Sequence, residues 1–270
     1  MEQLNFILKN YNKNRWGISD FALQTSFYNK RLADEISFSP KSIISFIFPY
    51  YTKNKEFCNI SKYAIIPDYH QWVKKELLNI VIKLKDAYPN NNFECYTDNS
   101  PIYEVSAAVN AGLGFKGKNN LLVTKEYGSF VFIGEIITDK KFDFDEKCNY
   151  SCLNCNKCVL NCKSSALKTK SYLLCNSYLT QKKGELLDFE KKIIKDGKYI
   201  WGCDDCQDCC PYNQNLKQVD FDEKLVCRLE LSELSRLSNK EFLDKYHNSA
   251  FIYRGKNIII RNISIKNNLF

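Results

Sequence analysis

The sequence predicts an α+β protein in three parts, and three observations support this fold class. Over residues 1–145, runs of β-branched and aromatic residues alternate with a stretch of helical periodicity. Most of the 13 cysteines are crowded into residues 146–215, and residues 216–270 contain the helical pattern LSELSRLSNKEFLDKY. We therefore expect a mixed α/β domain, then a cysteine-rich module, then a short helical C-terminal segment.

The first part begins with two expected strands and a long helix. SIISFIFPYY is a continuous apolar run typical of a buried strand, and KYAIIP at 62–67 is a second candidate. Between Pro67 and Pro89 the apolar residues recur at helical spacing with Lys and Glu between them, which predicts an amphipathic helix. These residues are Trp72, Val73, Leu77, Ile80, Val81 and Leu84.

More strands follow this helix. FECYT at 93–97 is expected to be a strand, and SPIYEVSAAVNAG a short helix with Ser100 as its cap and Pro101 at its first position. NLLVT and SFVFIGEIIT predict two further strands. From residue 146 to about 213 the composition shifts to cysteine-rich loops.

Composition and charge restrict the class of protein. No window approaches the ~20 apolar residues of a membrane span, and the first residues, MEQLNFILKNYNKNRWG, lack the layout of a signal peptide. A cytoplasmic chain without membrane contact is therefore expected. The formal charge of +8 fits either a polyanionic partner or a solvated lysine-rich surface.

The spacing of the cysteines favours iron–sulfur clusters over zinc. Zinc sites take two ligand pairs separated by a dozen or more residues, and the run CLNCNKCVLNCK is too compact for that. Its spacing, C-x2-C-x2-C-x3-C, is typical of ferredoxins, in which the fourth cysteine serves a different cluster. This pattern predicts a second motif, and CDDCQDCCP at 203–211 supplies it.

By this exchange rule, each of two [4Fe–4S] clusters takes four cysteines. Cys175 is the candidate for the ligand that the second motif lacks, and Cys209 is an alternative to Cys210, which directly precedes Pro211. The remaining cysteines are expected to be buried or incidental thiols, namely Cys58, Cys95, Cys148, Cys209 and Cys227. The first cluster is assigned Cys152, Cys155, Cys158 and Cys210, and the second Cys162, Cys175, Cys203 and Cys206.

Several separate segments resemble the epoxyqueuosine reductase family. The matching residues are YTDNSPIYEVSAAVNAGLGFKGKNNLL, GSFVFIGEIITD, the double-cluster segment, CNSYLT and WGCDDCQDCCPYN. KYAIIPDYH and SAFIYRGKNIIIRNISI are weaker matches, so the resemblance covers roughly residues 41–265. Lys163 departs from the family, which usually has proline there, and the N-terminal region and the C-terminus are shorter than in many members.

The resemblance implies cobalamin held between the first domain, residues 1–145, and a ferredoxin-like module, residues 146–215, followed by a basic helical segment, residues 216–270. It implies reduction of epoxyqueuosine to queuosine in tRNA, with two electrons and two protons consumed. The implied partners are the anticodon arm of a queuosine-type tRNA and an external electron donor, and the chain is expected to be a monomer.

Asp98 in YTDNSP matches the family's catalytic aspartate, which the resemblance implies is the acid near the departing oxygen. Desolvation over an apolar corrin face would raise the pKa of this carboxyl and keep a proton available. The alternative is a structural role, in which Asp98 caps the helix that begins near Pro101. We prefer the acid.

The loop GLGFKGK at 112–118 contains G-x-G-x-x-G but follows a helix and precedes a strand, the reverse of a dinucleotide-binding fingerprint. The resemblance makes it a loop whose glycines, Gly114 among them, let the backbone approach cobalamin, and an ordinary turn is the alternative. Further candidate cobalamin contacts are Asn119, Ser61, Ser177 and Asp204. His70 is expected to be a residue of the helix start rather than a cobalt ligand.

The sequence offers alternatives on three points. The basic C-terminal residues fit either tRNA phosphates or the exposed face of a packed helix; they are Arg254, Lys256, Arg261 and Lys266. A second enzyme class, a reductive dehalogenase, uses the same cofactors but usually carries an export signal. A third possibility is a two-cluster electron carrier without chemistry of its own.

Overall fold

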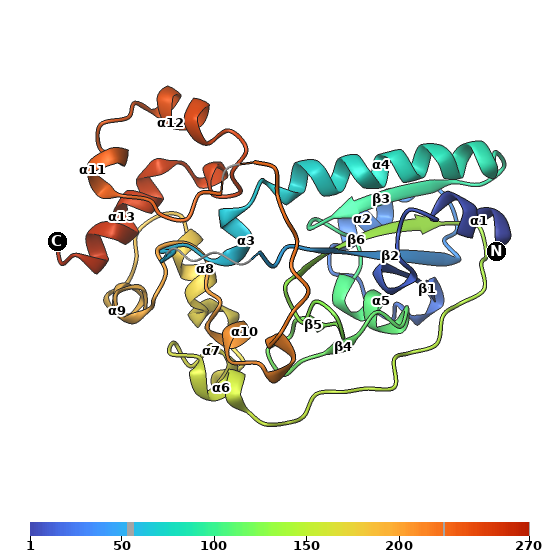
Figure 1. Ribbon diagram of the computed structural model, residues 1–270, viewed down its shortest axis with the longest axis horizontal. Coiled ribbons are helices and arrows are strands. Elements are labelled where there is room, and N and C mark those ends of the chain that lie inside the picture. Colours follow the sequence, from blue (N-terminus) through green and yellow to red (C-terminus); the bar gives the residue numbers. More distant parts are fainter. Residues whose placement is uncertain (53–56, 224, 270) are drawn as a thin grey trace. The chain divides into compact units, whose positions relative to one another are not determined.

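A computed structural model describes residues 1–52, 57–223 and 225–269 (Figure 1). The chain divides into two compact units. The first consists of Met1–Pro49 and Tyr69–Leu153, and the second of Tyr50–Asp68 and Asn154–Phe270. Each unit is therefore assembled from two stretches of chain.

A four-stranded antiparallel sheet forms the centre of the first unit. Its strand order is β1 (Trp16–Asp20), β2 (Ser42–Pro49), β6 (Val131–Thr138) and β3 (Phe93–Thr97). β2 and β6 pair along their whole length, from Ser42 opposite Thr138 to Pro49 opposite Val131. Strands expected in SIISFIFPYY, FECYT and SFVFIGEIIT are confirmed. A two-stranded sheet of β4 (Phe115–Lys116) and β5 (Leu122–Val123) lies within NLLVT and the residues before it.

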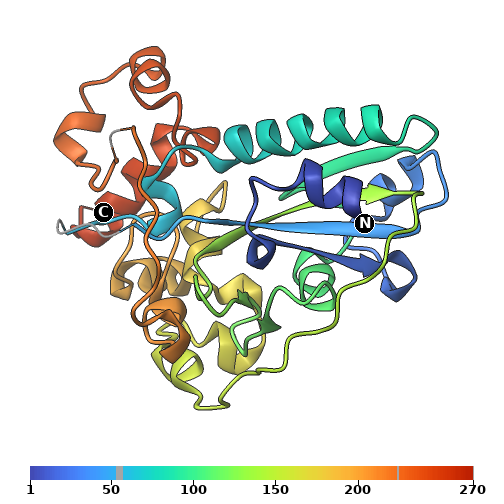
Figure 2. The ribbon, with the colours of Figure 1, turned by 45° about the vertical axis from the view of Figure 1, so that its right-hand side comes forward.

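Helices cover both faces of this sheet (Figure 2). α4 (Tyr69–Ala87) lies on one face together with α1 (Glu2–Ile7), and its buried residues Val73, Leu77 and Leu84 join a core with Phe46 and Ile136. The long helix predicted between Pro67 and Pro89 is confirmed. α5 (Glu104–Asn110) covers the opposite face, where it packs on β1, β2 and β6. α2 (Lys30–Glu35) completes the α-helices of this unit.

Two local expectations in this region are wrong. Residues 62–65 form a short helix, α3 (Lys62–Ile65), rather than a strand. Two isolated bridges flank it among the described residues, Ile60 to Trp201 and Pro67 to Ser249. The helix expected to be capped by Ser100 begins later, at Glu104, because Ser100 Oγ instead accepts a hydrogen bond from the Ile102 N–H at 3.3 Å.

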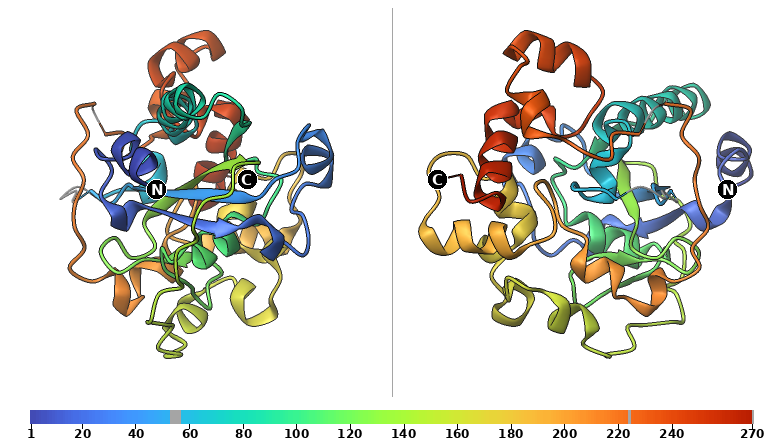
Figure 3. Two further views of the ribbon diagram at one scale, coloured as in Figure 1. Left: turned by 90° about the vertical axis from the view of Figure 1, so that its right-hand side faces the viewer. Right: turned by 60° about the vertical axis from the view of Figure 1, so that its left-hand side comes forward.

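The second unit is largely helical, including the stretch expected to form cysteine-rich loops. Its apolar core brings α8, α9 and α13 together through Leu179, Ile194 and Ile265 (Figure 3). The helical prediction for the C-terminal segment is confirmed. Besides α3, the described α-helices of the second unit are α6 (Lys157–Asn161), α7 (Ala166–Thr169), α8 (Asn176–Gln181), α9 (Asp188–Asp196), α10 (Asp205–Asp208), α11 (Leu231–Leu234), α12 (Asn239–Tyr246) and α13 (Lys256–Lys266).

Short 3-10 helices of three residues each occur in both units. In the residues that the structure describes, none of the helices has the length and apolar composition to cross a membrane. The 3-10 turns are η1 (Lys13–Arg15), η2 (Phe21–Leu23), η3 (Tyr172–Leu174), η4 (Pro211–Asn213) and η5 (Ile252–Arg254).

Candidate functional site

Four thiols from separate segments gather in the second unit. Burial raises the pKa of Cys206, and the nearby thiols of Cys203, Cys175 and Cys162 raise it further. Burial likewise raises the pKa of Cys203, with Cys175 again contributing. These four residues are the ones that cysteine spacing assigned to the second cluster. Close, buried thiols repel one another as thiolates, so a bound cationic centre is needed to hold them deprotonated.

The ligands assigned to the first cluster include one exposed thiol. Cys155 is exposed, Cys158 and Cys210 are partly exposed, and Cys152 lies at the end of the first unit. Cys209 lies beside Cys158 and Cys210, since both contribute to the raised pKa of its thiol after burial itself. However, Cys209 Sγ donates to the Cys206 carbonyl oxygen at 3.6 Å, which directs it toward its own helix.

Of the remaining thiols, Cys227 is buried, whereas Cys58, Cys95 and Cys148 are partly exposed. Within the described ranges, no group of three or more His, Cys, Asp or Glu side chains has the arrangement needed for a single metal ion.

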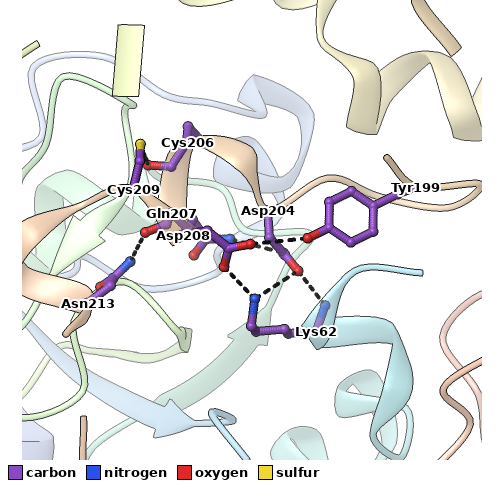
Figure 4. A network of polar contacts seen from close by, with 8 residues as sticks. All are labelled: Lys62, Tyr199, Asp204, Cys206, Gln207, Asp208, Cys209 and Asn213. Atoms are coloured by element: carbon purple, nitrogen blue, oxygen red, sulfur yellow. Dashed lines mark hydrogen bonds and ion pairs between the residues drawn. The ribbon is translucent and has the colours of Figure 1, made fainter. Parts of the chain in front are cut away.

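Asp204, a candidate cobalamin contact, lies fully buried in a polar network of the second unit (Figure 4). Its Oδ2 accepts from the Lys62 N–H at 2.7 Å and lies 3.7 Å from Lys62 Nζ, which also pairs with Asp208. Tyr199 donates its hydroxyl to Asp208 at 3.2 Å. Burial raises the pKa of Asp204 to about 6, against the opposing charge of Lys62. The Asp204 carboxylate therefore accepts a hydrogen bond from the first turn of α3, which the Ser61 side chain does not cap.

Ser61 precedes α3 and is also fully buried. Its N–H donates to the Trp201 carbonyl oxygen at 2.9 Å, but its hydroxyl has no hydrogen-bond partner among the described residues. Gly202 lies against it with φ +69°, and a Cβ there would come within 2.0 Å of Ser61 Oγ. Only glycine fits that position.

Asp98 directly follows β3 and adopts a left-handed conformation, φ 63°. Its side chain is 60% exposed, and Oδ2 lies 3.3 Å from His70 Nε2 at the start of α4. The hydrogen bond with His70 outweighs partial burial and lowers the pKa of Asp98, to which Tyr69 also contributes. The raised pKa expected for this carboxyl is therefore not found. His70 was expected only as a residue of the helix start, and its partner is 28 residues away in the chain.

The other candidate contacts lie on different elements. Gly114 packs closely on β5, where a Cβ would be 2.3 Å from the Val123 carbonyl oxygen, so internal packing alone requires glycine here. Asn119 is nearly buried and its Oδ1 accepts from the Leu121 N–H at 3.4 Å. Ser177, on α8, is partly exposed and accepts from Gln181 Nε2 at 3.4 Å. Asp98, Gly114 and Asn119 thus belong to the first unit, and the other candidates to the second.

Three of the four basic C-terminal residues have backbone partners: Lys256 Nζ donates to the Leu237 carbonyl oxygen, and the pair Arg261 and Lys266 makes contacts of the same kind. Arg261 Nη1 donates to the carbonyl oxygens of Lys182 and Gly184, at 2.8 and 3.2 Å. Lys266 Nζ donates to the carbonyl oxygens at the end of α9, among them Ile194 at 3.3 Å. These contacts favour helix packing over phosphate binding for this pair.

Sequence reasoning did not select two carboxyls near Asp98. Glu104 begins α5, and Glu135 lies inside β6 with no exposed surface. The signal for Glu135 was present, because it is the one charged residue in the apolar run SFVFIGEIIT. Charged side chains are almost never fully buried without a partner.

Family models match two parts of the chain. Residues 33–99 match "Epoxyqueuosine reductase QueG, DUF1730", a range that includes Asp98. Residues 151–213 match "4Fe-4S double cluster binding domain", a range that includes all eight assigned cysteines.

Curated epoxyqueuosine reductases are similar over most of the chain. The protein from Lactococcus garvieae is 35% identical over 73% of this chain, which spans 57% of that relative's length. The Listeria monocytogenes protein is 33% identical over 87% of this chain and 66% of its own length. The Cyclobacterium marinum protein is 33% identical over 91% of this chain and 81% of its own length.

A solved structure of epoxyqueuosine reductase from Streptococcus thermophilus shares the fold, with a TM-score of 0.84 and 28% identity. The match covers 98% of this chain and 80% of that chain. Another epoxyqueuosine reductase, crystallised with an epoxyqueuosine-modified tRNA-Tyr stem loop, has a TM-score of 0.82 and 25% identity with the same coverage. The chain has a mixed α+β fold and a double [4Fe–4S] cluster region. Because it is 33% identical to the Cyclobacterium marinum protein and covers 81% of that protein's length, this chain belongs to the epoxyqueuosine reductase family.

Proposed function

We propose that this chain reduces epoxyqueuosine in tRNA to queuosine, using two [4Fe–4S] clusters and cobalamin. The strongest support is the set of four neighbouring, partly exposed thiols inside the double-cluster region of a chain of this family, of which Cys203 and Cys206 have pKa values raised by burial. Thiols that burial makes costly to ionise gain most from binding iron, which stabilises the thiolate.

The assigned cysteines hold the clusters in this proposal. Cys162, Cys175, Cys203 and Cys206 bind the second cluster in this proposal, which is supported by the closeness of the other three thiols to Cys206, whose pKa they raise. Cys152, Cys155, Cys158 and Cys210 bind the first. Cys209 is left out because its thiol is already engaged with the Cys206 carbonyl oxygen.

Cobalamin is proposed to bind through five candidate contacts, namely Ser61, Gly114, Asn119, Ser177 and Asp204. Polar groups at the edge of a corrin ring need hydrogen-bond partners, and the chain offers the unpartnered Ser61 hydroxyl and the side chains of Asn119 and Ser177. Asp204 is a buried hydrogen-bond acceptor for the Lys62 N–H and so orders the first turn of α3, which follows Ser61. At Gly114 the absence of a side chain would let the backbone approach cobalamin.

When bound, cobalamin would supply two-electron reduction of the epoxide, with single electrons provided by the clusters. The chain itself must then supply protons, since conversion of an epoxide to an alkene and water consumes two electrons and two protons. Asp98 is the proposed acid because its carboxyl is exposed and is held by His70 at the end of β3. It would donate its proton to the oxygen as the carbon–oxygen bond breaks.

The proposed partners are the anticodon arm of a queuosine-type tRNA and an external one-electron donor. A relative of this fold was crystallised with an epoxyqueuosine-modified stem loop. The formal charge of +8 favours a polyanionic substrate, since phosphate contacts release counterions. The functional division would follow the sequence: a cobalamin domain over 1–145, a cluster module over 146–215 and a basic helical segment over 216–270, acting as a cytoplasmic monomer.

The function can be tested in cells that lack an epoxyqueuosine reductase of their own. Expression of this chain should convert the epoxyqueuosine in their tRNA to queuosine, whereas a Cys203→Ser variant should not. Accumulation of epoxyqueuosine in spite of normal expression and cluster content would refute the activity. A protein that only carried electrons would give this negative result.

A further inference from the structure

Two exposed tyrosines from distant parts of the chain pack against each other in the first unit. Tyr28 lies just before α2, and Tyr103 directly precedes α5. Their ring centroids lie 5.8 Å apart with 74° between the ring planes, which is an edge-to-face contact. Tyr28 is 65% exposed and Tyr103 is 46% exposed. Much of both side chains therefore faces solvent, although each ring already has an aromatic neighbour.

Hydrogen bonds hold the Tyr28 backbone against the segment that follows Asp98. The N–H groups of Tyr28 and Asn29 both donate to the Pro101 carbonyl oxygen, at 2.9 and 3.2 Å. Asn29 Nδ2 donates to Asn99 Oδ1 at 3.4 Å, and the Asn29 side chain also caps α2. The position of Tyr28 is thus fixed both by a capped helix and by the loop after β3.

The tyrosine pair lies close to the proposed acid. Asp98 and Tyr103 are five residues apart, and the chain turns tightly at the start of this stretch, where the Ser100 N–H donates to the Asp98 carbonyl oxygen at 3.1 Å. Asn99, the residue after Asp98, is bonded to Asn29, the residue after Tyr28. The acid and both rings therefore belong to one compact segment with exposed side chains.

An exposed aromatic pair has two possible roles here. It can pin the segment around Tyr28 to the loop after β3, or it can receive a flat ring from a ligand. The hydrogen bonds to Pro101 and Asn99 already join these two segments, so the rings are not required for pinning. Loops of RNA are recognised largely through unstacked bases, which stack on aromatic side chains. The exposure of the rings beside Asp98 favours this second role.

We propose that Tyr28 and Tyr103 form a stacking platform for a base of the tRNA loop that neighbours the reacting nucleotide. The proposal rests on the proposed function and deepens it, because it assigns residues that position the substrate. Stacking would hold the neighbouring nucleotide while the epoxide lies at Asp98. Such a contact uses ring surface and depends little on which base is present. The platform therefore supplies affinity and orientation, and the modified base supplies selectivity.

Binding to the platform can be measured without turnover. A fluorescently labelled, epoxyqueuosine-containing stem loop is titrated with the reconstituted chain and cobalamin in the absence of reductant. Tyr28→Ala and Tyr103→Ala should each weaken binding about tenfold, as expected when one stacked base is lost. Tyr28→Phe and Tyr103→Phe should bind like the wild type, because the ring is kept. Tyr28→Leu, which is apolar but has no ring, should behave like Tyr28→Ala.

Phe6→Ala is the matched control. Phe6 is 68% exposed and lies in α1, which packs on α4, on the sheet face opposite α5. Its loss should leave binding unchanged. A tenfold loss in Phe6→Ala equal to that in the tyrosine variants would show that exposed aromatic surface in general, and not the platform, supports binding, and would overturn the proposal.

Stem loops that lack the base on one side of the modified nucleotide identify the stacked partner. The wild type should bind one of the two abasic loops about tenfold more weakly than the complete loop. Tyr103→Ala should lose little further affinity for that abasic loop, because the same contact is already missing. If the losses from both abasic positions simply add to the loss from Tyr103→Ala, the rings stack on neither neighbour and the proposal is overturned.

Turnover separates this proposal from the proposed function. Tyr28→Ala and Tyr103→Ala should raise KM about tenfold and leave kcat near the wild-type value, because they remove binding and not chemistry. Unchanged affinity and KM in both variants, with normal queuosine formation by the wild type, would overturn the platform alone. Tyrosine-dependent binding without any queuosine formation by the wild type would refute the activity and leave the platform as an RNA contact.

Discussion

Nε2 of His70 lies 3.3 Å from Oδ2 of Asp98, which joins the start of α4 to the end of β3. The pair fixes a carboxyl that is otherwise exposed and that sits in a left-handed backbone conformation. Aspartate and asparagine tolerate this conformation better than most residues. The contact also lowers the pKa of this carboxyl.

Replacing His70 should therefore make Asp98 a weaker acid. In His70→Phe the largest effect on this carboxyl, the hydrogen bond from His70, is lost, and the pKa of Asp98 should rise. NMR titration of labelled aspartate in both proteins measures this directly, with Asp98→Asn to assign the signal. The pair is too exposed to contribute much to stability. An unchanged Asp98 pKa would mean that His70 does not control this carboxyl.

Metal content tests the cluster assignment. Anaerobic reconstitution should give about eight irons and eight acid-labile sulfides per chain, as two [4Fe–4S] clusters require. Elemental analysis together with sulfide determination measures both. Stoichiometric zinc without labile sulfide would remove the electron-transfer part of the account.

Serine substitutions at Cys175 and Cys209 distinguish a cluster ligand from a thiol that binds no iron. Cys175→Ser should lower iron and sulfide by about half, because one of two clusters loses a ligand. Cys209→Ser is the matched control, and it should keep both clusters because this thiol bonds to a backbone carbonyl oxygen. Loss of a cluster in Cys209→Ser with full content in Cys175→Ser would reverse the assignment.

The buried carboxyls make stability depend on pH. The pKa of Glu104 is about 7 in the folded chain against an ordinary value of 4.5, so between these values the folded state binds more protons than the unfolded state. Stability from this group is fully present below about pH 4.5 and falls as the pH rises toward 7. Urea unfolding midpoints should decline over this window in the wild type and decline less in Glu104→Gln. Parallel curves for the two proteins would show that Glu104 has a normal pKa.

Local patterns predicted much of the fold. The helical spacing of residues such as Val73 and Leu77 identified α4, and continuous apolar runs identified β2 and β6. These signals succeed because each element buries its own periodic face. The run at 62–65 failed because a few apolar residues fit a strand or a helix equally well, and the deciding contact is long-range: Asp204 accepts the Lys62 N–H from 142 residues away.

The candidate site was predictable where chemistry depends on spacing. The grouping of Cys162, Cys175, Cys203 and Cys206 follows from ferredoxin spacing and stays a prediction, although the structure places the other three thiols near enough to Cys206 to raise its pKa. The partnership of His70 with Asp98 has no local signal, because it joins two elements that only the sheet brings together. Glu135 could have been noticed as a lone charge in an apolar strand, but its link to Glu104 requires the position of α5.

The central claim is tested most directly by nucleoside analysis of epoxyqueuosine-containing tRNA after incubation with the reconstituted chain, cobalamin and a chemical reductant. The wild type should form queuosine. Asp98→Asn can keep the left-handed turn and the contact with His70 but cannot act as an acid. It should retain both clusters and cobalamin, yet lower the rate by about 10²- to 10⁴-fold. Queuosine formation by Asp98→Asn at the wild-type rate, with cofactor content verified, would contradict the role of this carboxyl, and no queuosine from the wild type would contradict the function itself.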